Sequence, residues 1–251
     1  MTDYTVEAVE EALGLLMLVA KSPGLGATEL ALRSGNTKAR TFRLLFTLEK
    51  SGLLCRDGDN PTYLLGYNSL YLGVAAESQI QLARLAKTFL RDMGIACNEN
   101  VQIRVRDGLD SVCVARWESS HHGGVQVEVG NRRPLYVGAS SKVLLAHAPE
   151  EIKNEVINGE RIRFTGATLV SKSSLKQSLA KILDDGYAVS YGEKSKDVVA
   201  IAAPVYNANS EVVASISVAG PATRIKEENV PGLIAIVTKS ARDLSNSLGY
   251  R

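Results

Sequence analysis

The chain has 251 residues, of which 45% are hydrophobic and 22% are charged, and its formal net charge is +2. This composition indicates one large or two modest globular domains, and no apolar run approaches the roughly 18 residues of a membrane span, so we expect a cytoplasmic protein with no membrane partner. The polar, acidic first residues do not resemble a secretory signal, and the spacing of Cys55, Cys97 and Cys113 argues against a zinc site or a disulfide framework.

The first predicted elements are two helices followed by a tight turn. Apolar residues recur at helical spacing from Val6 to Ala20, where Ser22-Pro23-Gly24 ends the helix. A short helix over Glu29 to Ser34 follows, with Thr28 as its expected N-cap. The turn at Gly35-Asn36 then leads into a third helix that ends at Ser51-Gly52.

This third helix, up to Lys50, has two contrasting faces. One face is mostly apolar and the other carries cations and hydrogen-bond donors: Thr41, Leu44, Leu45 and Leu48 against Asn36, Arg40, Arg43, Thr47 and Lys50. Such a helix can pack on a core and also lie in the major groove of DNA. The alternative is the solvated face of an ordinary surface helix. Seven cations between Lys21 and Arg56, framed by acidic residues, favour contact with a polyanion.

A predicted β-hairpin completes this part of the chain. Two short apolar runs, Leu53 to Arg56 and Thr62 to Leu65, flank a turn at Asp57 to Pro61. Helices, turn, helix and hairpin together predict a winged helix-turn-helix. Arg40 is the expected base contact, and Arg56 and Tyr63 on the wing are expected to touch phosphate. The full set of expected DNA contacts is Thr28, Thr37, Lys38, Arg40, Thr41, Arg43, Thr47, Lys50, Arg56 and Tyr63.

The rest of the chain predicts an α+β domain behind a long helix. Leu70 to Met93 is expected to be helical, to end at Gly94 and to pack against the second domain or a second subunit. Helices and strands then alternate around a mostly antiparallel sheet. The predicted strands are Val101 to Arg106, Ser111 to Trp117, Gly124 to Val129, Tyr187 to Tyr191, Asp197 to Val205 and Glu211 to Ala219. The predicted helices are Ser140 to His147, Glu150 to Ile157, Ser173 to Asp185, capped by Ser173 or Ser174, and Gly232 to Leu248.

The chain resembles the IclR family of bacterial transcriptional regulators over nearly its whole length. The blocks that carry the resemblance are Glu29-Leu30-Ala31, Arg43-Leu44-Leu45, Ser141-Lys142, Gly186-Tyr187-Ala188, Gly192-Glu193, Val199 to Val205 and Ser215-Ile216-Ser217 with Gly220-Pro221. The resemblance implies a winged helix-turn-helix over 1–66, a linker helix over 67–93 and a GAF-like α/β domain over 94–251 that binds an effector. It also implies a ligand-responsive regulator, expected to be the repressor of a catabolic operon, that forms homodimers or tetramers. Because one winged helix contacts too little DNA for useful specificity, we expect two of them to bind a pseudo-palindromic double-stranded DNA operator.

An effector site is expected at the turn Gly138 to Ser141, because the free N–H groups before a helix favour an anion. The alternative is that these serines only cap the helix. On two strands, Ser215, Ser217, Ala200 and Ala202 place small side chains on shared faces, which leaves room for a ligand. The expected effector is a small organic acid or a related lactone or semialdehyde. The resemblance places its contacts at Ala139, Ser140, Ser190, Ala200, Ser215 and Ser217, and Tyr136, at the entrance to the turn, completes the expected set.

Residues near this turn extend the expectation. Tyr136 and Trp117 are candidates for an apolar wall. Arg116, Arg132 and Arg133 are candidates for balancing a carboxylate, with solvated loop arginines as the alternative.

An enzyme is the competing class, in the form of a small-molecule hydrolase with a GAF-like domain. The only histidines are His121, His122 and His147, and adjacent histidines rarely chelate one metal. Lys142 lacks a serine at the spacing of a Ser-x-x-Lys nucleophile. We therefore expect no catalytic residues, no metal site and no cofactor.

Overall fold

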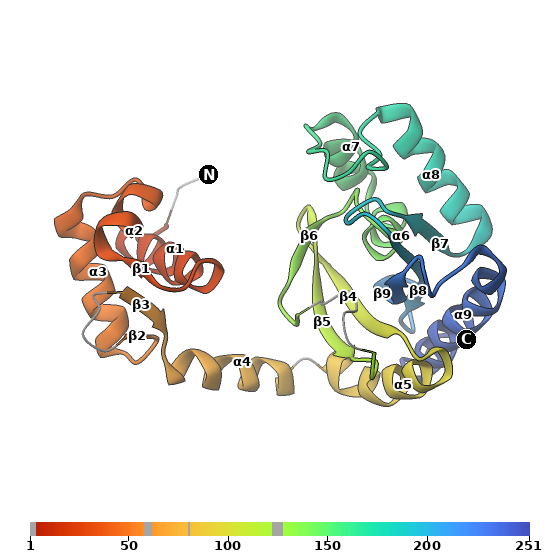
Figure 1. Ribbon diagram of the computed structural model, residues 1–251, viewed down its shortest axis with the longest axis horizontal. Helices are drawn as coiled ribbons and strands as arrows, with labels where there is room; N and C mark the ends of the chain where they lie inside the picture. The colour runs from red at the N-terminus through yellow and green to blue at the C-terminus, as the bar shows by residue number, and fades with distance from the viewer. Residues whose placement is uncertain (1–3, 58–61, 80, 122–127) are drawn as a thin grey trace. The chain divides into compact units, whose positions relative to one another are not determined.

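The computed structural model of the protein describes residues 4–57, 62–79, 81–121 and 128–251 (Figure 1). Contacts within the chain divide it into two compact units, Met1–Gln79 and Ile80–Arg251. Across the described ranges, each helix is too short or too polar to span a bilayer.

The first unit is a winged helix-turn-helix, as predicted. Its elements are α1 (Glu7–Lys21), β1 (Leu25–Gly26), α2 (Ala27–Ser34), α3 (Lys38–Lys50), β2 (Leu54–Arg56), β3 (Thr62–Leu65) and α4 (Tyr67–Gln79). The strands form an antiparallel sheet in the order β1-β3-β2. The core between helices and sheet contains Leu15, Val19, Leu30, Leu45, Leu48, Leu54 and Tyr63. The predicted turn of the wing falls on 58–61, outside the described residues.

The cap of α2 differs from the prediction. The helix begins at Ala27 and its N-cap is Gly26, so Thr28 lies inside the first turn rather than before it. β1 takes Leu25 and Gly26 into the sheet, and the helix starts directly where that strand ends. At the other end of α2, Gly35 adopts a left-handed conformation with φ of 73°, as the predicted tight turn requires.

The second unit is an antiparallel sheet with helices on both faces. It contains α5 (Gln81–Cys97), β4 (Asn100–Asp107), β5 (Asp110–Trp117), β6 (Arg132–Pro134), α6 (Ala139–Ala146), α7 (Glu150–Asn158), α8 (Lys172–Asp185), β7 (Ala188–Tyr191), β8 (Val198–Tyr206), β9 (Val212–Pro221), the short 3₁₀ helix η1 (Glu227–Asn229) and α9 (Val230–Ser247). The strand order is β6-β5-β4-β9-β8-β7. Most of the predicted strand Gly124 to Val129 falls on 122–127, outside the described residues.

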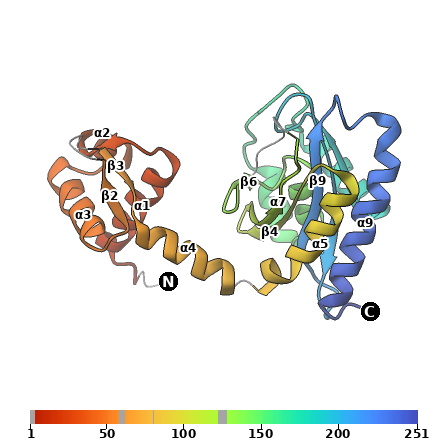
Figure 2. The same ribbon diagram turned by 60° about the horizontal axis from the view of Figure 1, so that its bottom comes forward.

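The two faces of this sheet differ in chemistry, and both follow from the alternation of side chains along each strand. Figure 2 shows α5 and α9 running along one face, which is apolar and includes Val101, Ile103 and Ile216. The opposite face carries small and polar residues, and α6 packs on it. Ser215 and Ser217 point to this second face, while Ile216 and Val218 point to the first, as predicted.

Two helix boundaries in this unit differ from those predicted from the sequence. Gly94 does not end a helix, because α5 continues to Cys97. Gly94 instead allows the Trp117 ring to approach, since a Cβ at this position would meet the ring at 2.1 Å. The cap of α8 is Ser171, whose hydroxyl accepts the backbone N–H of Ser174 at 3.1 Å, rather than Ser173 or Ser174.

Candidate nucleic-acid interface and ligand pocket

The third helix, α3, presents the predicted cationic face. The Thr37 hydroxyl caps it by accepting the backbone N–H of Arg40 at 3.3 Å. Leu45 and Leu48 are buried in the core of the first unit, so the opposite side of the helix faces outward. Its outward residues include Lys38, Arg43, Thr47 and Lys50, all of which are exposed.

Three cations of this surface have free charges. Among the residues that the structure describes, Lys38, Arg43 and Lys50 have no carboxylate within ion-pair distance. Thr47 donates its hydroxyl to the backbone oxygen of Arg43 at 2.9 Å, and its side chain remains exposed. A row of unpaired cations on an exposed helix attracts a polyanion such as the DNA backbone.

Arg40, the expected base contact, is engaged elsewhere. Its guanidinium lies 2.5 Å from the carboxylate of Glu11 and 3.1 Å from that of Glu7, both on α1. Hydrogen bonds to Glu11 and Glu7 raise the pKa of Arg40. Arg40 therefore joins α1 to α3, and two of its three guanidinium nitrogens already face carboxylates.

Two other expected DNA contacts are buried. Thr41 has no exposed surface, because it faces the core from α3, and we correct it to a core residue. Tyr63 is 2% exposed, since its ring fills the core between β3 and the helices, so it is not a phosphate contact on the wing. Arg56 is half-exposed, pairs with Glu49 at 2.9 Å and lies over the Tyr63 ring. Thr28 is exposed on α2.

The second unit holds a cavity on the small-residue face of its sheet. The cavity has a volume of about 30 Å³, which is room for a water molecule or two and is smaller than the about 300–1,000 Å³ of most ligand pockets. It lies between the start of α6, the strands β4, β7, β8 and β9, and the loop after β7. Its lining residues are Gln102, Arg133, Gly138, Ala139, Ser140, Ser190, Glu193, Lys194, Ser195, Val198, Ala200 and Ala219.

Four of the seven expected effector contacts line this cavity, namely Ala139, Ser140, Ser190 and Ala200. The other three have hydrogen-bond partners within the protein. Ser217 accepts the hydroxyl of Ser140 at 2.8 Å, and Ser215 donates to the backbone oxygen of Ser140 at 3.0 Å. Both serines therefore hold the first turn of α6 against the sheet. Tyr136 is buried, and its hydroxyl bonds the backbone of Ile162.

The start of α6 already holds a carboxylate of the chain. Glu193 accepts the backbone N–H of Gly138 through Oε2 at 2.9 Å, and its Oε1 lies 2.5 Å from Nζ of Lys142. Both side chains of this ion pair are almost completely buried. The helix terminus attracts an anion as expected, but Glu193 supplies part of that negative charge and neutralises Lys142.

Two other cations at the cavity, Arg133 and Lys194, have no carboxylate partner within the described part of the chain. Nε of Arg133 is buried and has no hydrogen-bond partner among the described residues. Burial lowers the pKa of Arg133. Its Nη1 lies 3.2 Å from where a Cβ on Gly138 would be, so the glycine leaves room for the guanidinium. Burial, followed by the charge of Arg133, also lowers the pKa of Lys194 at the cavity wall.

A completely buried guanidinium lies next to the cavity, where it donates to Gln102 of the cavity wall. Arg104 has no exposed surface, and it donates to the hydroxyl and backbone oxygen of Ser111 and to the backbone oxygen of Asn131. Burial, followed by the charge of Arg133, lowers the pKa of Arg104 to about 10. No carboxylate among the described residues forms an ion pair with Arg104. Glu193 pairs with Lys142, and no carboxylate among the described residues forms an ion pair with Arg104, Arg133 or Lys194.

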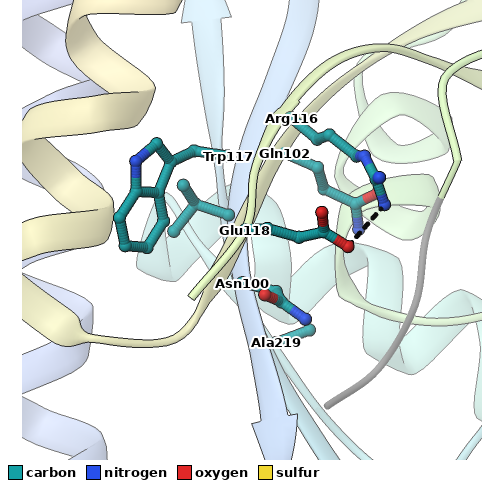
Figure 3. Close-up of a pocket in the computed structure, with 7 residues that line it drawn as sticks. Asn100, Gln102, Arg116, Trp117, Glu118 and Ala219 are labelled. Carbon is teal, nitrogen blue, oxygen red and sulfur yellow. Dashed lines mark ion pairs between the residues drawn. The ribbon is translucent and has the colours of Figure 1, made fainter. Parts of the chain in front are cut away.

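A smaller cavity adjoins the first and shares Gln102 and Ala219 with it (Figure 3). Arg116 lines it and pairs with Glu118 at 3.1 Å, so its charge is already balanced. Figure 3 shows Trp117 turned towards the helix that carries Gly94, away from Arg116. Trp117 therefore belongs to the apolar face of the sheet and is not a wall of the larger cavity.

The residues that sequence analysis missed are the charged ones. The sequence assigned no role in ligand binding to Glu193 or Lys194. For Arg133 it left two interpretations open, a partner for a ligand carboxylate and a solvated loop arginine. The signal that could have identified Arg133 is its place directly before the turn that precedes α6. Within the described ranges, no group of three or more His, Cys, Asp and Glu side chains is placed to hold a metal ion. His121 is exposed, and His122 lies outside the described residues.

Comparison with known proteins places these features in a family. The model of the IclR helix-turn-helix domain matches residues 8–58, and that of the bacterial transcriptional regulator IclR C-terminal matches residues 74–246. The HTH-type transcriptional regulator KipR of Bacillus subtilis is 31% identical over 97% of this chain and 98% of its own length. The regulator KdgR of Escherichia coli is 27% identical over 98% of this chain and 94% of its own length.

Solved structures agree with the sequence comparisons. An IclR transcriptional regulator from Alicyclobacillus acidocaldarius superposes with a TM-score of 0.87 at 25% identity, covering 97% of this chain and 99% of its own. The IclR of Thermotoga maritima gives a TM-score of 0.76 at 26% identity, covering 96% and 98%. An IclR homologue from Microbacterium hydrocarbonoxydans, complexed with 4-hydroxybenzoate, gives 0.84 at 20% identity, covering 96% and 99%.

Proposed function

The chain belongs to the IclR family of bacterial transcriptional regulators, and we propose that it represses a catabolic operon until a small organic acid binds its second unit. The family assignment decides between the two classes that the sequence left open, because the matched relatives are DNA-binding regulators and not hydrolases. The protein is a DNA-binding transcriptional regulator; the effector, the residues that bind it and the assembly are proposals.

The proposal for DNA binding assigns Lys38, Arg43 and Lys50 to the operator. Their charges are exposed and unpaired among the described residues. Each lysine that neutralises a phosphate releases condensed counterions, so it steepens the dependence of affinity on salt. Arg43 lies nearest the middle of the exposed face of α3 and is our choice for a base contact in place of Arg40.

The proposal for the effector is carried by one observation, the buried and unpartnered Nε of Arg133 at the cavity wall. A buried donor without a partner costs free energy, which a ligand carboxylate would recover. Ser140 and Ser190 add hydroxyl groups to the same cavity, so we propose an acid that also bears hydroxyl or carbonyl groups, and the cavity of about 30 Å³ must widen to admit it. A lactone or semialdehyde would form hydrogen bonds with these hydroxyl groups, but it would lack the ion pair between a ligand carboxylate and Arg133.

We further propose that the operator is a pseudo-palindrome bound by a homodimer, which pairs again in a tetramer. One winged helix contacts too little DNA for useful specificity. Large apolar side chains lie exposed along α1 and α4 of the first unit, including Val9, Leu13, Met17, Leu70 and Val74. Exposed apolar side chains in this number are typical of a contact between subunits.

The test of the effector proposal compares two neighbouring arginines in the full-length protein. Calorimetry with a panel of small carboxylic acids should identify ligands of the parent protein, and Arg133→Met should weaken their binding by about tenfold or more. Arg132→Met is the matched control, because Arg132 is exposed and pairs with Asp107 at 2.7 Å. Both variants should bind the operator normally without ligand. Equal affinity of Arg133→Met and the parent for every acid that binds would contradict the proposal.

A further inference from the structure

The recognition helix α3 carries two large apolar side chains that its own unit does not bury. Phe42 is 52% exposed and Phe46 is 53% exposed. They lie four residues apart, so their rings are neighbours on the helix surface. An exposed phenyl ring leaves much of its contact area unused, and two of them on one helix define an apolar patch, here called the Phe42–Phe46 patch.

The position of the patch on α3 decides what can cover it. Because Leu45 and Leu48 face the core, the row that holds Phe42 and Phe46 lies beside the row that holds Arg43 and Lys50. Lys38 precedes Phe42 by four residues and is exposed, so cations lie at the end and along the side of the patch. A second copy of this surface would bring like charges together, whereas a polyanion would be attracted to it.

We propose that Phe42 and Phe46 recognise thymine by contacting its 5-methyl group in the major groove, an inference that rests on the proposed binding of α3 to the operator. The methyl group of thymine is the apolar feature that base pairs display in that groove, and phenylalanine is one of the residues suited to contact it. The guanidinium of Arg40, on the other flank of α3, is already bonded to carboxylates of α1. Sequence preference on this side of the helix therefore comes from apolar contact, beside the base contact proposed for Arg43, with Lys50 holding the adjacent DNA backbone.

Removing single methyl groups from the operator tests this directly. The full-length protein selects a duplex from a random library, and each thymine of that duplex is replaced in turn by deoxyuridine, which differs only by the methyl group. Binding by fluorescence anisotropy should weaken about fourfold at one or more positions, as expected for one buried methyl group. Phe42→Ala or Phe46→Ala should weaken binding to the original duplex and should not respond further to deoxyuridine at its own position.

A matched control separates this effect from a general loss of apolar surface. Leu32 on α2 is 77% exposed and lies outside α3, so Leu32→Ala should keep the full response to deoxyuridine. The proposal is overturned if no deoxyuridine weakens the parent, if both phenylalanine variants keep every penalty, or if selection yields no common sequence. It is also overturned if the variants sediment as smaller assemblies and lose affinity for all duplexes alike, because the patch would then join two copies of the chain.

Discussion

The buried ion pair between Lys142 and Glu193 supports a stability prediction for the variant Glu193→Gln. The side chains are only 3% and 7% exposed, so neither charge can be hydrated when its partner is removed. A glutamine can still accept the N–H of Gly138 through its carbonyl oxygen, which leaves the lost charge as the main change. Removing one partner of a buried pair costs about 3–5 kcal/mol.

This cost should appear in the unfolding of the second unit. For a unit of this size, each kcal/mol lowers the unfolding midpoint by about 2–4 °C, so we expect a decrease of roughly 6–20 °C. The chain has a single tryptophan, Trp117, and it lies in the second unit against α5. Its fluorescence during thermal or urea unfolding therefore measures that unit without interference from the first.

Two further variants make the result interpretable. Combining Glu193→Gln with Lys142→Met removes both charges, and most of the lost stability should return. Asp185→Asn breaks the exposed pair with Lys181, whose side chain is 75% exposed, and should cost less than about 1 kcal/mol. The reasoning is refuted if Glu193→Gln costs no more than Asp185→Asn, or if the double variant is as unstable as the single one.

Three other predictions concern the DNA-binding surface, the cysteines and the assembly. Arg43→Ala should weaken operator binding about tenfold or more. Arg40→Ala should weaken operator binding less than about threefold, because carboxylates of α1 already hold Arg40. Equal losses of affinity in anisotropy measurements would contradict this. A thiol reagent at pH 8 should modify the exposed Cys55 first and Cys113 only after unfolding, because burial shields Cys113 and raises its pKa; native labelling of both at one rate would be inconsistent. Leu13→Glu should convert the protein to monomers in sedimentation, since Leu13 is exposed on the apolar side of α1; an unchanged sedimentation coefficient would exclude this surface.

Much of the fold follows from local patterns. The alternation in β8 and β9 identified which residues face the apolar side of the sheet, and the 3.6-residue period of α3 separated Leu45 from Arg43. The caps were predicted less well, because a cap depends on backbone dihedral angles that neighbouring residues set. Threonine is a common N-cap residue, which favoured Thr28 in the sequence. In the structure, pairing of β1 with β3 places Gly26 at the N-cap of α2 instead. The edge strand β6 was missed because it has only three residues.

The sites were harder to predict, because their chemistry depends on distant partners. Arg40 and Glu11 are 29 residues apart, so no local period shows that they pair. Ser217 lies on the face of the sheet that was predicted, but α6 packs on that face and the Ser217 hydroxyl accepts a hydrogen bond from Ser140 of this helix. Arg133 looks like a solvated arginine in the sequence, and only the structure shows that the residue is half-buried with a fully buried Nε. Polarity along a strand predicts a face, whereas the packing of a helix on that face decides which residues remain for a ligand.

The same packing indicates how an effector can influence α5. A ligand changes DNA binding only by favouring one arrangement of the protein over another. Gln102 lines the cavity from β4, while its neighbour Val101 faces α5 from the other side of the strand and pairs with Trp117 of β5. Trp117 in turn packs on Gly94 of α5 so closely that a methyl group would not fit between them. A ligand that shifts β4 and β5 must therefore move α5 or break the contact between Trp117 and Gly94. In the chain, one residue separates α5 from α4. The contact between Gly94 and Trp117 is tight enough to transmit such a shift, because close-packed side chains leave no space in which to absorb it.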